Sequence, residues 1–180
     1  MTKGDGTVAG LRMTDNEDSG KIDIGGNFAN IADSSHTLQP RPAFARLNSN
    51  GSLDTSFGPT GGSAPHVQLF NGEVRCSTGL PDGRIVLGGL FTQLVDGSIP
   101  RGRIAAFTPN GLLDNSFAGA GADLPIYGMG AQGDKQGNGK LVIGGNFSMY
   151  NNTLRLEIAR IMARSVSFNP ATQLLLLLGD

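Results

Sequence analysis

A nine-residue motif that occurs three times sets the strongest limit on how this chain can fold. It reads GKIDIGGNF at residues 20–28, GRIVLGGLF at 83–91 and GKLVIGGNF at 139–147. The glycine pairs follow one another at intervals of 63 and 56 residues. A period of this order is typical of a single supersecondary unit such as a four-stranded propeller blade.

A second motif supports the same register. Residues 45–57 read ARLNSNGSLDTSF, and residues 105–117, sixty positions later, read AAFTPNGLLDNSF. The Asn-Gly dipeptide in both copies is a hairpin signal. A third copy begins at residues 158–161 and keeps only the first part of the motif, and residues 166–179 read as the opening of a further unit.

These repeats predict an all-β fold made of tandem four-stranded, blade-like units of a β-propeller. The composition agrees, because 28 glycines and only 16% charged residues are typical of a turn-rich β protein. We expect a single domain over residues 1–180, with units at approximately 7–66, 67–122 and 123–164 and a partial closing unit at 165–180.

Each unit has an apolar strand that ends on the glycine pair, followed by a phenylalanine that enters the core. Missing Cβ atoms permit a bulge or the close approach of a neighbouring backbone. The residues that define the repeat are Gly25, Gly26, Phe28, Gly88, Gly89, Phe91, Gly144, Gly145 and Phe147, with Asp54 and Asp114 from the second motif.

The strand before the glycine pair is apolar throughout at residues 85–87 and 141–143, as expected of a sheet that neighbours cover on both faces. Asp23 occupies the middle position in the first copy. This carboxylate indicates either an uncovered face on a terminal unit or simply a solvated strand.

The oxygen-bearing side chains around Gly51 resemble a calcium loop, but Thr108 and Pro109 replace the leading ligands in the second copy. The recurring need is therefore a turn, in which Asp54 and Asp114 cap backbone N–H groups. We predict no metal and no cofactor.

Catalytic chemistry has little support in the sequence. Cys76 is the only cysteine, and His36 and His66 are the only histidines, with no third group indicated to orient a Cys-His pair. Glu17 and Asp18 lie in a polar turn, for which a solvated loop is the ordinary interpretation. The alternative is a glycosidase-like carboxylate pair, but the chain has no tryptophan to form the usual sugar-stacking platform. We expect no catalytic residue and no enzyme activity.

Charge and hydropathy limit the partners. A formal net charge of -1 gives no basic field for nucleic acid, and the longest apolar run, residues 174–178, is too short to cross a membrane. No apolar run follows Lys3, so the sequence as given carries no secretory signal. We expect neither nucleic-acid binding nor membrane insertion.

Two apolar segments are candidate interfaces. One is an insertion at residues 58–73, which either packs on another subunit or folds back over its own unit; the other is the final run, which we expect to act as a strand exchanged between copies. The candidate interface residues are His66, Val67, Leu69, Phe70, Leu174, Leu176 and Leu178.

These motifs resemble the delta-60 repeat family of β-propeller-like proteins, from about Val8 to Gly179. The resemblance rests on the Asp82-Gly83-Arg84 turn, the Gly-Gly-x-Phe motifs and the Leu-Asp pairs that end at Asp54 and Asp114. It implies a propeller-type repeat found in large bacterial surface or exported proteins and in virion or phage structures, generally without assigned catalytic activity.

Closed propellers have about four to eight blades, so three units do not close an ordinary ring. We therefore expect a homo-oligomer or a larger assembly. The predicted function is a non-enzymatic structural or adhesive module on a cell surface or on a virion, as in a phage tail or capsid component. The alternative is a propeller that binds a glycan or surface receptor through its variable inter-strand loops.

Overall fold

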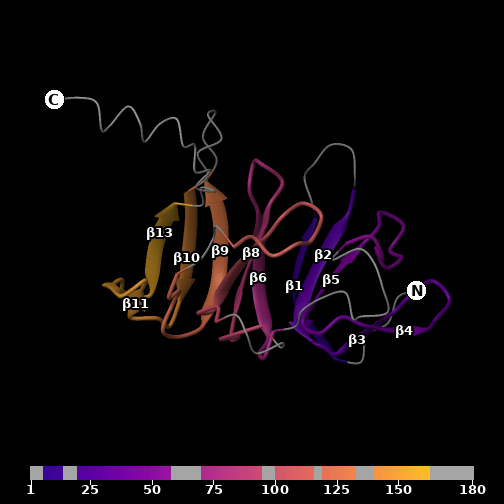
Figure 1. The fold of residues 1–180 in the computed structure, drawn as a ribbon, viewed down its shortest axis with the longest axis horizontal. Helices are drawn as coiled ribbons and strands as arrows, with labels where there is room; N and C mark the ends of the chain where they lie inside the picture. Colours follow the sequence, from indigo (N-terminus) through magenta and orange to yellow (C-terminus); the bar gives the residue numbers. More distant parts are fainter. Residues whose placement is uncertain are drawn as a thin grey trace.

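Every regular element in the described part of the chain is a β-strand, which confirms the all-β prediction (Figure 1). The computed structural model describes residues 6–13, 20–57, 70–94, 100–115, 119–132 and 140–162. Its strands are β1 (Thr7–Met13), β2 (Ile22–Asn27), β3 (Asn30–Ala32), β4 (Leu38–Pro40), β5 (Phe44–Leu47), β6 (Val74–Gly79), β7 (Ile85–Gly89), β8 (Ile104–Phe107), β9 (Ile126–Gln132), β10 (Lys140–Gly145), β11 (Met149–Tyr150), β12 (Thr153–Leu154) and β13 (Ile158–Met162).

The strands form three three-stranded antiparallel sheets, one around each copy of the glycine motif. The first sheet has the order β1-β2-β5, the second β6-β7-β8 and the third β9-β10-β13. The motif strand is central in each sheet. Small hairpins, β3–β4 and β11–β12, follow the motif in the first and third units.

The fourth strand of each predicted blade is reduced to one β-bridge in the first two units. Leu47 bridges to Leu53, and Phe107 bridges to Leu113. Asp54 then accepts a hydrogen bond from the Ser56 backbone N–H at 3.0 Å, a local turn that ends the pairing. The predicted closing unit at residues 165–180 lies outside the described residues, and the limits of the units stay a prediction.

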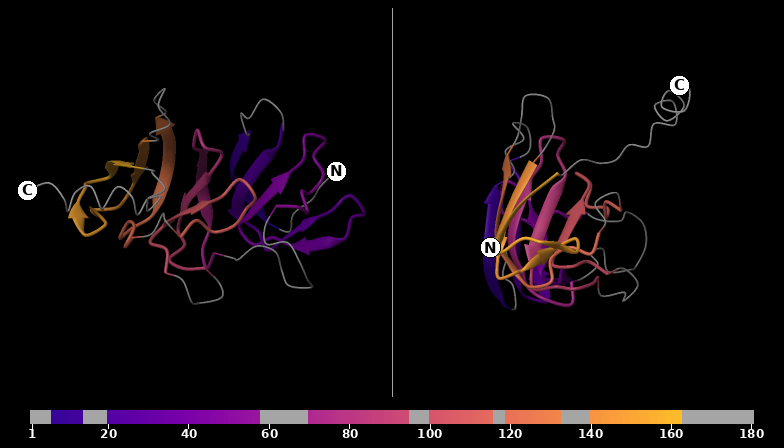
Figure 2. Two further views of the ribbon diagram at one scale, coloured as in Figure 1. Left: turned by 45° about the horizontal axis from the view of Figure 1, so that its top comes forward. Right: turned by 90° about the vertical axis from the view of Figure 1, so that its left-hand side faces the viewer.

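The three sheets stand in a row and face one another, as the views along and across the row show (Figures 1 and 2). Their first strands, β1, β6 and β9, lie next to one another in series. Apolar clusters fill both spaces between the sheets. This face-to-face arrangement of successive sheets is that of neighbouring propeller blades.

The second sheet is covered on both faces, as its unbroken apolar strand predicts. Ile85 and Leu87 belong to the cluster shared with the first sheet, whereas Val86 belongs to the cluster shared with the third. All three side chains are buried. Alternation along the strand thus sends neighbouring residues into different interfaces.

Candidate functional site

The two glycines of each pair have different surroundings, and the second one makes a bulge. At Gly26, Gly89 and Gly145 an added Cβ would collide with a backbone carbonyl at the start of the neighbouring first strand or one residue before it, at Thr7, Glu73 and Pro125. The pairing register shifts at the same place in all three sheets. The second glycine therefore admits a close backbone approach within its own sheet.

We expect Gly89→Ala to lower the free energy of unfolding by about 1–3 kcal/mol, because rigid backbone must move to admit the methyl group. Gly130→Ala is the matched control, since its Cβ would meet nothing within 4 Å, and it should change stability by less than about 0.5 kcal/mol. Urea unfolding compares the two variants. Equal losses would contradict the assignment.

The first glycine of each pair faces the next sheet and forms a socket. A Cβ at Gly25 would lie 2.7 Å from Cγ1 of Val74, on β6. A Cβ at Gly88 would lie 3.1 Å from Cγ2 of Ile126, on β9, and 2.5 Å from Cε of Met129. Val74 and Ile126 are both 0% exposed, so each sheet inserts an apolar side chain into the socket of the sheet before it.

The third socket is open as far as the described residues go. Among them, a Cβ at Gly144 would meet only the Glu157 carbonyl oxygen, at 3.8 Å, and the neighbouring Gly128 and Gly130 have nothing within 4 Å of theirs. Ile104 and Ile158 occupy the same place in the second and third sheets, yet Ile104 is 4% exposed and Ile158 is 64% exposed.

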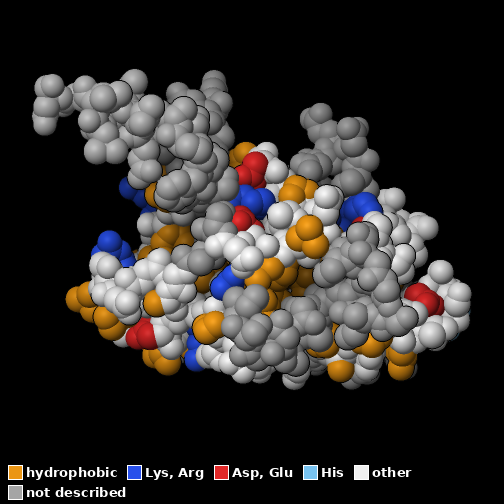
Figure 3. Space-filling model, viewed as in Figure 1, with side chains coloured by type: hydrophobic (Ala, Val, Ile, Leu, Met, Phe, Trp, Pro, Cys, Tyr) orange, Lys and Arg blue, Asp and Glu red, His pale blue; other side chains and the backbone are white. Residues whose placement is uncertain are grey.

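We use the name outer face for the uncovered side of the third sheet. Its members are Gly128, Gly130, Val142, Gly144, Ile158 and Arg160. Leu154, Leu156 and Met162, in or beside the strands at this end of the molecule, are also exposed. Hydrophobic side chains are visible at this end, to the left in Figure 3. The outer face has the form of a blade-to-blade contact, and no strand in the described part of the chain packs on it.

A buried ion pair lies within the first sheet, and its arginine also contacts the second unit. Asp23 is fully buried, and the Arg46 Nε donates to its Oδ1 at 2.9 Å. The Arg46 guanidinium carbon lies 3.9 Å from the centre of the Phe57 ring, and its Nη1 donates to the Pro109 carbonyl at 3.0 Å. Both expectations for Asp23, an uncovered face and a solvated strand, are therefore wrong. The cross-strand partner Arg46 supplies the compensating charge.

The aspartates of the Leu-Asp pairs tie each turn to the motif strand of the same sheet. Asp54 accepts hydrogen bonds from Lys21 Nζ at 2.5 Å and from Ser56, and Asp114 accepts one from Arg84 Nη1 at 2.7 Å. Burial alone would raise the pKa of Asp54, but the hydrogen bonds from Lys21 and Ser56 outweigh it and hold the pKa below its usual value. These side-chain contacts hold the turn against the start of the motif strand.

Comparison with known families assigns the repeat. The family model described as a domain of unknown function (DUF5122) β-propeller matches residues 18–57, 80–117 and 136–163, more than half of the chain. The chain belongs to this family. The three matched segments of the DUF5122 chain contain the central and last strands of its three sheets. No curated protein and no solved structure matches the chain.

Cys76 of the DUF5122 chain lies at the contact between the second and third sheets. Burial raises the pKa of its thiol to about 12, against a weaker opposing effect of a backbone hydrogen bond from Gly88. His66, which would be the base of a Cys-His pair, lies outside the described residues. Within the described ranges, no group of three or more His, Cys, Asp or Glu residues could hold a metal ion.

We expect iodoacetamide to alkylate Cys76 at pH 8 at least about a hundredfold more slowly in the folded chain than in urea, because only the thiolate reacts. Mass spectrometry of the labelled chain over time measures both rates. Similar rates in the two states would contradict the buried, protonated thiol.

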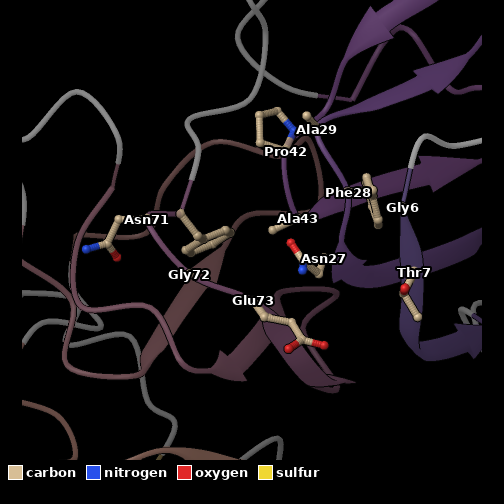
Figure 4. A pocket seen from close by; sticks show the side chains of 11 residues that line it. Gly6, Thr7, Asn27, Phe28, Ala29, Pro42, Ala43, Asn71, Gly72 and Glu73 are labelled. Atoms are coloured by element: carbon tan, nitrogen blue, oxygen red, sulfur yellow. The ribbon is translucent and has the colours of Figure 1, made fainter.

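A cleft of about 570 Å³ opens between the first and second units of the DUF5122 chain (Figure 4). Its lining residues are Gly6, Thr7, Asn27, Phe28, Ala29, Pro42, Ala43, Phe70, Asn71, Gly72 and Glu73. Glu73 pairs with Arg75 at 2.9 Å, and the Asn71 side chain accepts the backbone N–H groups of Thr92 and Gln93. The Asn27 side chain is exposed at the rim.

The remaining candidate residues divide by their position. The repeat phenylalanines Phe28, Phe91 and Phe147 are buried. Phe70 is buried within this chain, with its ring centroid 4.2 Å from that of Phe91 and 6.0 Å from that of Phe107. Six other candidate interface residues lie outside the described residues: His66, Val67, Leu69, Leu174, Leu176 and Leu178. No helix in the described part of the chain is long and apolar enough to span a membrane.

Proposed function

We propose that this chain is a non-enzymatic structural module of the β-propeller type that assembles with other copies or chains through its outer face. The observation that carries the proposal is the contrast between Ile104 and Ile158. Isoleucine at this strand position is buried where a further sheet follows and exposed where no sheet of the described residues follows. A blade contact that ends on open apolar surface is suited to docking.

The size of the exposed apolar surface supports the proposal. Leu154, Leu156, Ile158 and Met162 are all more than half exposed. Full burial of one such side chain contributes about 1.5–3 kcal/mol, so covering this surface would offset a substantial part of the cost of association. The exposed Arg155 and Arg160 supply charge beside it.

We expect Ile158→Asp to abolish assembly, because the contact would have to bury an unpaired carboxylate. Sedimentation velocity over a range of concentrations measures the effect. Leu112→Asp is the matched control, since Leu112 is also exposed but belongs to a turn of the second unit. An unaltered sedimentation coefficient for Ile158→Asp would exclude the outer face as the site of assembly.

We infer that the assembled module has a structural or adhesive role on a cell surface or on a virion, such as a phage tail or capsid. The support for this setting is the resemblance of the three repeats to the delta-60 family. Immunogold labelling of intact cells and of purified virions from the source tests it. Label confined to the cytoplasm would contradict both settings.

The cleft beside Asn27 favours a second candidate function, binding of a glycan. An exposed amide and the nearby Glu73 carboxylate are groups that hydrogen-bond to sugar hydroxyls. Glycan-array binding that is lost in Asn27→Ala, with the solution mass unchanged, would support this function. Absence of any array signal for the wild-type chain would count against it.

A further inference from the structure

The first strand of each sheet carries one apolar residue at an equivalent position. Val8, Val74 and Ile126 each pair in register with the second glycine of their own sheet, at Gly26, Gly89 and Gly145, and each lies beside a bulge. Val74 and Ile126 are 0% exposed because they fill the sockets of the preceding sheets. Val8 is 48% exposed.

Among the described residues, Val8 is thus an apolar side chain without a socket, and Gly144 forms a socket without a side chain. We propose that Val8 of a second copy of this chain occupies the space beside Gly144, so that the first sheet of one copy packs on the third sheet of the other. This inference rests on the proposed assembly function and names its partner. The contact repeats the packing already present twice within the chain, of Val74 at Gly25 and Ile126 at Gly88.

A polar contact fits the same arrangement. Arg46 of the first sheet donates to the Pro109 carbonyl in the turn of the second unit, and Arg160 has the equivalent strand position in the third sheet. Arg160 is exposed. In the proposed contact its guanidinium would reach the equivalent turn of the first unit in the second copy.

That receiving turn has the same backbone structure as the turn that Arg46 contacts. Asn48 N donates to Ser52 O at 2.8 Å, as Thr108 N donates to Leu112 O at 2.8 Å. Ser49 therefore corresponds to Pro109, and its carbonyl is the expected acceptor for Arg160. The exposed arginine and the exposed turn provide a second complementary pair beside the apolar one.

The number of sheets sets the number of copies. Closed propellers have about four to eight blades, and six is the only multiple of three in that range. Two copies that each contribute the three sheets of the described residues would complete a six-bladed ring. Each copy then gives Val8 to its partner and receives the partner's Val8, so the assembly is closed and needs no third copy.

Cysteine cross-linking tests the contact, in a Cys76→Ser background that removes the native thiol. The double variant Val8→Cys, Gly144→Cys should form a disulfide-linked dimer on oxidation. The two positions lie on β1 and β10, which the second sheet separates within one copy (Figure 1). Because stacked sheets lie about 10 Å apart, the two positions are too far apart within one copy for a disulfide, which spans a Cα separation of at most about 7 Å. The matched control Gly25→Cys, Val74→Cys should link within one chain and keep the monomer mass under denaturing conditions.

Gly144→Leu tests the same contact without cross-linking. The added side chain would fill the open socket, so we expect loss of the dimer with an unchanged thermal midpoint of the isolated chain. Two results would overturn the Val8 contact if the wild-type chain is an oligomer: the double cysteine variant forms no disulfide-linked dimer, or Gly144→Leu leaves the oligomer intact. Either result would mean that the copies assemble through another surface. A wild-type chain that stays monomeric would overturn the Val8 contact and all assembly between copies, and would leave only the docking of a different chain on the outer face.

Discussion

Replacing Phe91 with alanine is expected to lower the free energy of unfolding by about 3–5 kcal/mol. The Phe91 side chain is 0% exposed and belongs to the cluster between the first and second sheets. Its ring centroid lies 4.2 Å from that of Phe70, so truncation removes an aromatic contact as well as buried area. The surrounding sheets are held by their own hydrogen bonds and can close the resulting cavity only in part.

Urea unfolding followed by circular dichroism measures the loss. The matched control is Leu90→Asn at the adjacent half-buried position, where the other two copies of the motif have Asn27 and Asn146. That variant should cost less than about 1 kcal/mol. A loss below about 1 kcal/mol for Phe91→Ala would mean that the repeat phenylalanine does not anchor the contact between the sheets.

The second large effect concerns the ion pair between Asp23 and Arg46. Removing the carboxylate in Asp23→Val leaves the Arg46 guanidinium buried beside Phe57 without its partner, which should cost about 3–5 kcal/mol. The second sheet has Val86 and Ala106 in the same two positions. The double variant Asp23→Val, Arg46→Ala copies that pair and should recover most of the stability lost in the single variant.

A double-mutant cycle with Asp23→Val, Arg46→Ala and the combination measures this coupling. We expect a strongly favourable interaction energy, because each single variant leaves one charge without compensation. Additive losses would contradict the account, since they would mean that Asp23 and Arg46 stabilise the fold independently.

The strands were predictable from the sequence because their signals are local. Alternation, the glycine pair and the Asn-Gly turn all lie within a few residues of the strand they define, and the three central strands follow the motif directly. The burial of Asp23 could not be predicted from its own strand, because its charge is compensated by Arg46 from a different strand. The relevant signal was the appearance of Asp23 and Arg46 together in the first copy and of Val86 and Ala106 together in the second.

The different roles of the two glycines in each pair also could not be predicted from the sequence. Val74, which fills the socket at Gly25, is 49 positions away, and only the stacking of the sheets brings the two together. The residue before the last strand of each sheet is a further example. Ala43, Arg103 and Glu157 have φ values of 64°, 66° and 62°, although none of these residue types favours that region.

The mass of the chain in solution distinguishes the closed dimer from a monomer. Size-exclusion chromatography with light scattering gives that mass without reference to shape. We expect a discrete species of twice 18.7 kDa, in which the outer face of each copy is covered by the first sheet of the other. A single species of 18.7 kDa at all concentrations would contradict the closed dimer.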